Sequence, residues 1–332
     1  MFPVGLNIEG IVNMRIVDFA EAHIEQAAQI ALHDYHGERR HVPSLPPIDA
    51  VPDLTPYTKN GLGVAALEDG KMIGFLCAVG PFDNAFRSTD AVGVFSPLGA
   101  NGAVGENRAN VYARLYQAAG EKWMRAGAAS HAVCLFAHDI EIQQQFFQYS
   151  FGLRCIDAVR GMESLNIIPC EDYEFVELEK DEHHKVFPLD CMLNQYQCTS
   201  PYFLRREPRT LESFMNSVEI NSERFFAAKY RGVLCAFLMV ASGGDTFIAD
   251  EKGYADVGSA FCLPEHRGKG VYQNLLDFAI SVLRRDGYIR LGVDFESYNP
   301  TAYGFWLKYF DAYAHSVVRR IDEDVLTKGK AI

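Results

Sequence analysis

A short glycine-containing loop in the C-terminal half carries the residues with the most specific chemical implications. Residues 267–271, with the sequence RGKGV, follow an apolar stretch and precede a long amphipathic segment. Glycine lets a backbone approach a ligand closely, and such a loop turns several N–H groups outward. Those donors, the positive end of the following helix and the charges of Arg267 and Lys269 form a site suited to a diphosphate.

Two better-known phosphate-binding patterns fail here on spacing. A Walker loop requires Ser or Thr directly after the lysine, but Gly270 follows Lys269. A dinucleotide-binding Gly-x-Gly-x-x-Gly loop beginning at Gly268 requires a third glycine at the position that Gln273 occupies. A basic turn without a ligand stays an alternative on these residues alone.

An acidic residue, Asp294, lies in the apolar stretch that follows this amphipathic segment. It alternates with Val293 and Phe295, so its side chain faces away from theirs in a strand. A solvated Asp at a strand end would account for it without any chemical role. Asn299 lies five residues after Asp294 and could contact a ligand. A role as the N-cap of the next helix would also explain an asparagine at this position.

The surrounding residues predict which elements position these side chains. Apolar side chains recur at helical spacing from Val271, and Gly287 suits the end of that helix. A second helix is expected to begin after Asn299, because Pro300 favours a first helical turn. Strands are predicted at 234–241, 256–263, 289–297 and 315–321.

The N-terminal half repeats this order of elements. The matching segments are 71–80, 90–102, 110–127, 131–139 and 142–153. Corresponding positions keep nearly one spacing: Phe75 to Phe237 is 162, Tyr112 to Tyr272 is 160, and Arg160 to Arg319 is 159. We therefore predict a tandem duplication of one α/β unit. The expected division is a leader at 1–13, a first domain at 14–168 and a second at 169–332, with 182–216 helical and loop-like.

The first copy departs from the second at the loop. Residues 96–105 contain glycines but neither Arg nor Lys, and the spacing from Gly93 to Tyr112 is 19, against 14 from Gly258 to Tyr272. We expect this copy to be degenerate and to supply structure and one wall of a cleft. A second, looser site for the same ligand is the alternative.

Composition excludes several classes of protein. The 332 residues are 48% hydrophobic and 22% charged, as in ordinary globular proteins, and the net charge of −12 argues against a broad nucleic-acid surface. No apolar run is long enough to span a bilayer, and the start lacks the features of a secretory signal. We expect a cytoplasmic protein with neither nucleic acid nor membrane as a partner.

The cysteines and histidines do not suggest a metal centre. The eight cysteines contain no Cys-x-x-Cys pair, and most lie within apolar runs. Free, buried thiols are therefore expected, with no disulfide framework. The histidine spacings do not match those of metal ligands either, so no metal is expected.

Two blocks resemble the GCN5-related N-acetyltransferase (GNAT) family. Its acetyl-CoA signature, Arg/Gln-x-x-Gly-x-Gly/Ala between a strand and a helix, is matched by residues 267–272, except that Tyr272 replaces the last small residue. A later block, Asn-x-x-Ala-x-x-hydrophobic-Tyr, is matched by Asn299, Ala302 and Phe305, with Trp306 in the Tyr position. The resemblance covers about 225–321, and the first half follows it more weakly.

This resemblance implies two tandem GNAT-like domains of the α/β (α+β) class, each a mixed, mostly antiparallel sheet flanked by helices. It implies an acyltransferase that moves an acetyl group from acetyl-CoA to a primary amine of a small molecule or peptide, by direct attack in a ternary complex. Acetyl-CoA would lie between the strands at 256–263 and 289–296. The expected contacts are Phe261, Cys262, Leu263, Arg267, Gly268, Lys269, Gly270, Val271, Tyr272 and Asn299. Whether the protein is a monomer or a homodimer stays open.

The same resemblance gives Asp294 the place of the family's general base. The usual acid is a Tyr, which Trp306 replaces, and an indole cannot donate a proton in that way. Tyr303 and Tyr309 lie one turn on either side and are expected to share the helical face of Trp306. Either could be the acid, with aromatic packing as the alternative. An acyl group on Cys262 is conceivable, but a small strand residue suffices there.

Two other functions stay open at this point. A non-catalytic acyl-CoA-binding or regulatory module is supported by Trp306 in place of the family Tyr. An aminoacyl-tRNA-dependent transferase is the third possibility, since some of those proteins also carry paired GNAT-like domains. The intact loop at 267–270 and the acidic composition argue against this last one.

Overall fold

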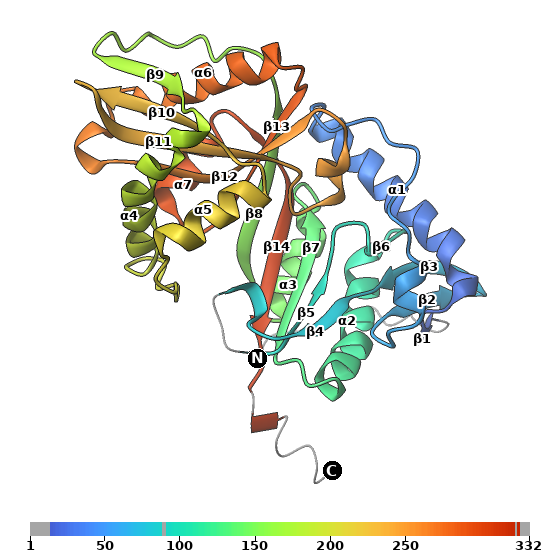
Figure 1. Cartoon of the computed structure of the whole chain (residues 1–332). Coiled ribbons are helices and arrows are strands. Elements are labelled where there is room, and N and C mark those ends of the chain that lie inside the picture. Colours follow the sequence, from blue (N-terminus) through green and yellow to red (C-terminus); the bar gives the residue numbers. More distant parts are fainter. Residues whose placement is uncertain (1–13, 88–90, 323, 326–332) are drawn as a thin grey trace, which may run out of the picture.

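The computed structural model describes residues 14–87, 91–322 and 324–325, so the leader expected at 1–13 lies outside the described residues. Two sheets and their flanking helices form the fold (Figure 1). A sheet of four strands has the order β1-β2-β3-β6, and a sheet of ten strands has the order β4-β5-β7-β14-β8-β13-β12-β11-β10-β9. No helix in these ranges is long and apolar enough to cross a membrane.

The second half of the chain has the order of elements that the sequence predicts. Its strands and helices are β9 (Tyr173–Glu177), α4 (Phe187–Gln197), α5 (Leu211–Ile220), β10 (Arg224–Tyr230), β11 (Val233–Ser242), β12 (Tyr254–Cys262), α6 (Val271–Arg285), β13 (Arg290–Glu296), α7 (Pro300–Trp306) and β14 (Asp311–Arg320). Short 3-10 helices occur at Lys180–Val186, Phe247–Asp250 and Pro264–His266. The expected repeat is confirmed at the level of element order.

The first half contains the matching elements with one distortion. They are β1 (Met14–Asp18), α1 (Ile24–His41), β2 (Val64–Glu68), β3 (Lys71–Leu76), β4 (Val79–Phe82), β5 (Gly93–Ser96), β6 (Asn101–Ala103), α2 (Arg108–Arg125), β7 (Ser130–Phe136), α3 (Ile140–Gln148) and β8 (Gly152–Gly161). Further 3-10 helices lie at Glu21–His23, Thr55–Thr58 and Ala85–Arg87. Two strands of this half are interrupted: one is divided into β3 and β4, and the other into β5 and β6. As a result, β3 and β6 pair in the four-stranded sheet, whereas β4 and β5 pair in the ten-stranded sheet.

The two halves exchange their closing strands. β8, the last strand of the first half, pairs with β13 of the second, and β14 of the second half pairs with β7 of the first. β8 and β14 also pair with each other and run side by side through the middle of the molecule (Figure 1). The sequence predicts a closing strand for each half but not which strand it pairs with. One sheet consequently runs through both units, and the exact boundary between domains stays a prediction.

A gap opens between β12 and β13 beside the exchanged strand. Their parallel pairing ends at Val257 and Val293. Beyond that point β12 stays paired with β11, while β13 stays paired with β8. The helix α6 holds this arrangement from one face, where its side chains Leu275, Leu276, Ala279 and Leu283 are fully buried. Each buried leucine contributes about 1.5–3 kcal/mol.

Candidate functional site

The glycine loop has the conformation of an anion site. Gly268 and Gly270 have φ of +73° and +78°, a left-handed conformation that side chains other than glycine adopt with strain. Gly270 is the N-cap of α6, and the loop from Arg267 to Lys269 is exposed. Within the described chain the N–H groups of Gly268, Lys269 and Gly270 donate to no acceptor. They are therefore free donors at the positive end of a helix.

Tyr272 does not block this loop. Its hydroxyl donates to the carbonyl oxygen of Phe237 at 3.1 Å, on β11. Its ring packs edge-on against Phe305 and Trp306, with centroid separations of 5.2 and 6.1 Å. The bulk that replaces the family's small residue is accommodated in the core beneath α6.

The two basic side chains of the loop differ in their contacts. Arg267 donates from Nε to the carbonyl oxygen of Cys262 at 2.8 Å, and its guanidinium lies over the rings of Phe261 and Tyr196. Arg267 therefore ties the loop to the end of β12 and to α4. Lys269 is exposed, and no ion pair of the described chain involves its side chain.

The hollow beside the loop is unsuited to a phosphate. Glu171, Asp172 and Glu265 line it together with Lys269. Since those three side chains would repel an anion, this hollow is a poor place for a phosphate group.

Three of the expected contact residues, Phe261, Cys262 and Val271, have buried side chains, and Leu263 is partly buried. Phe261 packs between the sheet and the helices α4 and α5, whereas Cys262 and Val271 lie in the core beneath α6. Burial raises the pKa of the Cys262 thiol to about 11, which disfavours the reactive thiolate. Leu263 packs against the core beneath α6 and against the core that contains Phe261, and its N–H donates to the carbonyl oxygen of Cys235. Only the backbone of these residues is positioned to meet a ligand.

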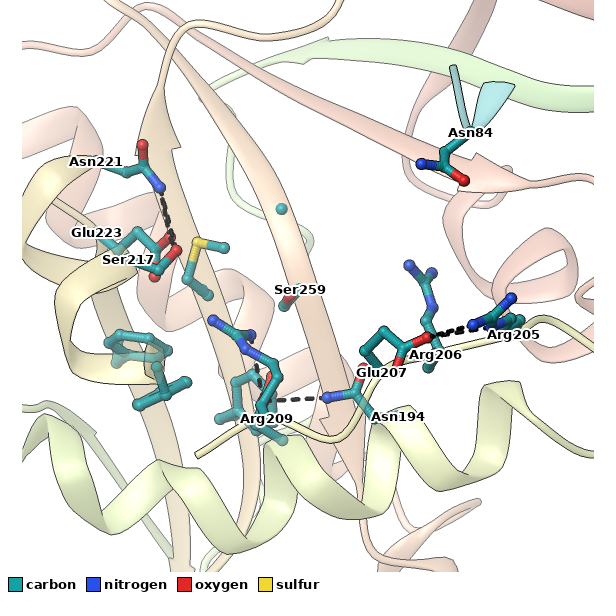
Figure 2. Close-up of a pocket in the computed structure, with 16 residues that line it drawn as sticks. Asn84, Asn194, Arg205, Arg206, Glu207, Arg209, Ser217, Asn221, Glu223 and Ser259 are labelled. Carbon is teal, nitrogen blue, oxygen red and sulfur yellow. Dashed lines mark hydrogen bonds and ion pairs between the residues drawn. The ribbon is translucent and has the colours of Figure 1, made fainter. Parts of the chain in front are cut away.

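A cavity of about 730 Å³ opens where β12 and β13 diverge. Val257 and Val293, the last paired residues, line it together with Asp294, Asn299 and other residues of both units. A second pocket of about 760 Å³ adjoins it and shares Asp190, Asn194, Arg206, Arg209, Gly258 and Ser259 with it. Figure 2 shows this second pocket, with Arg209 and Asn194 on one side and Asn84 of the first unit approaching from the other.

Asp294 faces this cavity with an altered pKa. Burial is the main cause, the charges of Asp245 and Glu296 add to it, and together they raise the pKa of Asp294 to about 7. The thiol of Cys155 is the only side-chain hydrogen-bond donor that the described residues offer it, at 3.9 Å from Oδ2. A carboxyl group with a pKa near neutrality is suited to accept and return a proton.

Sequence reasoning missed the carboxylate opposite Asp294. Asp157 on β8 is the register partner of Asp294, is 6% exposed and lines the same cavity. Burial, followed by the charge of Asp294, raises its pKa well above the ordinary value. A single polar residue among Ile156, Ala158 and Val159 was the only signal in the sequence. It could not have been interpreted without knowing that β8 crosses into the second unit.

Basic side chains meet the cavity from the segment before α5. Arg209 pairs with Asp190 at 3.3 Å, and Arg206 approaches Glu296 at 3.7 Å. Arg154 on β8 lies 4.0 Å from the same glutamate. Arg209 thus has an acidic partner at hydrogen-bond distance, whereas Arg154 and Arg206 share Glu296 beyond that distance, and the buried Nε of Arg206 has no hydrogen-bond partner among the described residues.

Asn299 and Trp306 both line the cavity. Asn299 is the predicted N-cap, because its side-chain oxygen accepts from the N–H groups of Thr301 and Ala302. Trp306 is 4% exposed and packs against Tyr272 and Phe310.

The expectation that Tyr303 and Tyr309 share a helical face with Trp306 is wrong. The helix α7 ends at Trp306, so Tyr309 lies in the turn beyond it, against Phe305. Tyr303 is 47% exposed, and neither tyrosine lines the cavity that contains Asp294. The aromatic residues at 303–310 are spaced as in a continuous helix, but the chain turns after Trp306, where Phe310 packs edge-on against the Trp306 ring.

In the first unit the equivalent gap is filled by protein. The side-chain amide of Asn101 donates to Ser96, Pro97 and Cys134, which bridges the end of β5 to β7, and its oxygen accepts from Tyr112. The nearest cation, Arg108, is paired with Asp139 at 2.5 Å and with Asp34 at 3.5 Å. Among the described residues, Asn101 bridges this gap and the nearest cation is already paired.

The acetyl-CoA that the family resemblance implies is therefore expected to bind once per chain. Titration calorimetry on the whole protein should give a stoichiometry of one, because Asn101 occupies the space that the ligand's arm needs in the first unit. A variant with a changed loop at 267–271 should bind no acetyl-CoA at all, because the first unit offers no second site. A stoichiometry of two would contradict the filled gap.

Comparison with known proteins relates this architecture to acetyltransferases. Residues 189–311 match the model of the Acetyltransferase (GNAT) family. The chain is similar to a GCN5-related N-acetyltransferase from Sphaerobacter thermophilus, at 12% identity and a TM-score of 0.55, over 92% of this chain and 95% of that one. It is also similar to a tandem GNAT protein from the clavulanic acid biosynthesis pathway, at 14% identity and a TM-score of 0.45, over 92% and 98%. No curated protein sequence matches the chain.

Proposed function

Because the chain carries a GNAT acetyltransferase domain and has the fold of that family, we propose that it is an acetyl-CoA-dependent N-acetyltransferase whose working site lies in the second unit. The observation that carries this proposal is the unoccupied set of N–H donors at Gly268, Lys269 and Gly270, directly before α6. Such a set suits the diphosphate of coenzyme A. The gap between β12 and β13 begins where a thioester arm would have to enter.

The roles of the side chains follow from their places in the cavity. Asp294 takes the proton of the acceptor amine, since its pKa of about 7 keeps a useful fraction ionised at neutral pH. Acetyl-CoA supplies the activated acyl group, and the neutral amine attacks it directly. The residues of β12 and α7 hold the two reactants together, which removes much of the entropic barrier.

Binding of acetyl-CoA is the first test. Millimolar acetyl-CoA should raise the melting temperature of the whole protein by several degrees, because a ligand at about 100 times its Kd stabilises the folded state by about 2.7 kcal/mol. Differential scanning fluorimetry measures the shift, and coenzyme A without the acetyl group is the matched ligand control. An unchanged melting curve with both ligands would refute the proposed function.

Turnover should be followed by chromatography of coenzyme A over a panel of amines. A thiol-reactive dye is unsuitable, because Cys191 and Cys198 are exposed and would react as well. Acceptor-dependent release of coenzyme A supports the transferase.

A non-catalytic acyl-CoA-binding module is the second candidate. It is favoured by Trp306 at the position of the family's tyrosine and by the distance of Tyr303 and Tyr309 from the cavity lining. Binding of acetyl-CoA without release of coenzyme A for any amine would favour this module over the enzyme.

A further inference from the structure

Carboxylates exceed cations in the cavity between β12 and β13. Its acidic lining residues are Asp157, Asp190, Asp245, Asp294 and Glu296, and its basic ones are Arg154, Arg206 and Arg209. The arginines meet Asp190 and Glu296, as described above. Among the described residues no cation pairs with Asp157, Asp245 or Asp294.

Asp157 is the member of this group that points most directly to a ligand. More than nine-tenths of the residue is buried, it lines the cavity, and no hydrogen bond or ion pair of the described chain reaches its carboxylate. Burying an unpaired carboxylate is unfavourable for folding. The alternating neighbours Ile156 and Ala158 lie in the core under α6, so packing of the strand does not require a charge here. A cation entering the cavity would complete the missing pair.

The geometry of the strands gathers a third carboxylate. Asp157 and Asp294 stand directly opposite each other on antiparallel strands, where Cβ atoms are about 4.5–5.5 Å apart. Asp256 on β12 is paired with Gly292, two residues before Asp294, so it shares the same face of the sheet. Carboxylates this close cannot all be ionised without a compensating cation.

We propose that Asp157 and Asp294 together receive the acceptor amine, and that this acceptor is a compact diamine or polyamine. The inference rests on the proposed acetyl transfer. One nitrogen forms the bond to the acetyl carbon as the carbon–sulfur bond breaks. Its proton passes to Asp294, which releases it to the solvent, and the departing thiolate takes up one proton from the solvent, so that Asp294 is regenerated and the net proton transfer is from nitrogen to sulfur. The second nitrogen stays protonated and lies among the remaining carboxylates, where Asp157 is a positioning residue.

An acceptor carrying a carboxylate fits less well. Its negative group would meet Asp157, Asp245 and Asp294, while Arg209 is engaged with Asp190 and Arg206 offers one unpartnered nitrogen, Nε. Electrostatic complementarity of this kind gives specificity by repelling the wrong ligand as well as by attracting the right one.

The test is titration calorimetry on the whole protein, without acyl-CoA, at neutral pH and low salt. Three linear four-carbon ligands separate the alternatives: diaminobutane has two ammonium groups, butylamine has one, and γ-aminobutyrate has one with a carboxylate. We expect diaminobutane to bind at least about tenfold more tightly than butylamine, which corresponds to ~1.4 kcal/mol. We expect γ-aminobutyrate to bind more weakly than butylamine.

Asp157→Asn separates a ligand-binding role from a structural one. The variant should lose the preference for diaminobutane over butylamine, and the free protein should melt no lower than the wild type, because the amide keeps the size of the side chain without its buried acidic group. A merely structural role predicts a lower melting temperature and an equal loss for both ligands. Asp181→Asn, at an exposed position in the 3-10 helix before α4, is the matched control and should change neither property.

Equal binding of diaminobutane and butylamine would overturn the inference. Tightest binding of γ-aminobutyrate would also overturn it and would assign specificity to Arg206 and Arg209. These outcomes do not depend on acyl transfer, because acyl-CoA is absent from the titration. If acetyl-CoA shifts the melting curve but diaminobutane shows no preference, only this inference fails.

Discussion

Gly270→Asp is expected to abolish binding of acetyl-CoA, with Kd raised at least about a hundredfold, or ~2.7 kcal/mol. Gly270 is the N-cap of α6 with φ of +78°, and its N–H is one of the free donors of the loop. A carboxylate at this position would compete for the same N–H groups and repel the diphosphate. An added Cβ would also lie 3.2 Å from the sulfur of Cys170. Calorimetry with acetyl-CoA measures the loss.

Backbone strain is separated from the electrostatic effect by a control at the other end of the same helix. Gly287 has φ of +93°, and a Cβ there would meet no atom within 4 Å. Gly287→Asp therefore introduces comparable strain, about 1–2 kcal/mol, without approaching the loop. It should bind acetyl-CoA as the wild type does. Equal loss in both variants, or full binding by Gly270→Asp, would remove the loop from the proposed site.

The local order of elements could be predicted from the sequence because each element carries its own pattern. The apolar stripe that begins at Val271, the glycines of the loop and the cap at Asn299 are short-range signals, and the structure places α6 and α7 where they indicate. The near-constant spacing between the halves likewise predicts the repeat.

The acidic cavity could not be predicted because it depends on long-range pairing. Asp157 meets Asp294 only because β8 crosses to β13, and no residue in β8 records which strand it will join. The filled gap of the first unit has the same origin, since Asn101 bonds to Cys134, 33 positions away. The aromatic residues after Trp306 gave a wrong prediction for a different reason. Their spacing suits a helix, but α7 ends at Trp306.

The exchange of closing strands relates the degenerate first unit to the working site. A copy that had simply lost its ligand could be dispensable, but this one supplies β8, which forms one side of the gap and carries Asp157. It also supplies Asn84 and Phe82 to the pockets. The first unit is therefore part of the cavity wall, and changes in it alter the acceptor side without touching the glycine loop.

Asp294→Asn should lower kcat by about a hundredfold to ten-thousandfold, the range that a positioned general base contributes. The amide keeps the size of the side chain but cannot accept the proton. Binding of acetyl-CoA should be unchanged, because the loop at Gly268–Gly270 is separate. Steady-state kinetics with the best acceptor measure the loss, and Asp311→Asn, exposed on β14, is the matched control.

The pH dependence of kcat/KM is an independent test of Asp294 as the general base. The groups that face Asp294 are Asp157 and Cys155 on β8, Asp256 on β12, Glu296 on β13 and Asp245 beyond β11. Its pKa of about 7 means that kcat/KM should rise with pH through neutrality as the base ionises. The asparagine variant should lack this limb. A wild-type profile that is flat between pH 6 and 8 would exclude Asp294 as the base.

Stability should respond to pH in the opposite sense. A carboxyl group whose pKa is raised on folding binds more protons in the folded than in the unfolded state between its two pKa values. The free energy of unfolding therefore falls as the pH rises from about 4 to about 7, the window set by the shift of Asp294. Asp294→Asn should flatten that fall and melt above the wild type at pH 8. A variant that is less active and more stable identifies Asp294 as a group retained for its chemistry at the expense of the fold.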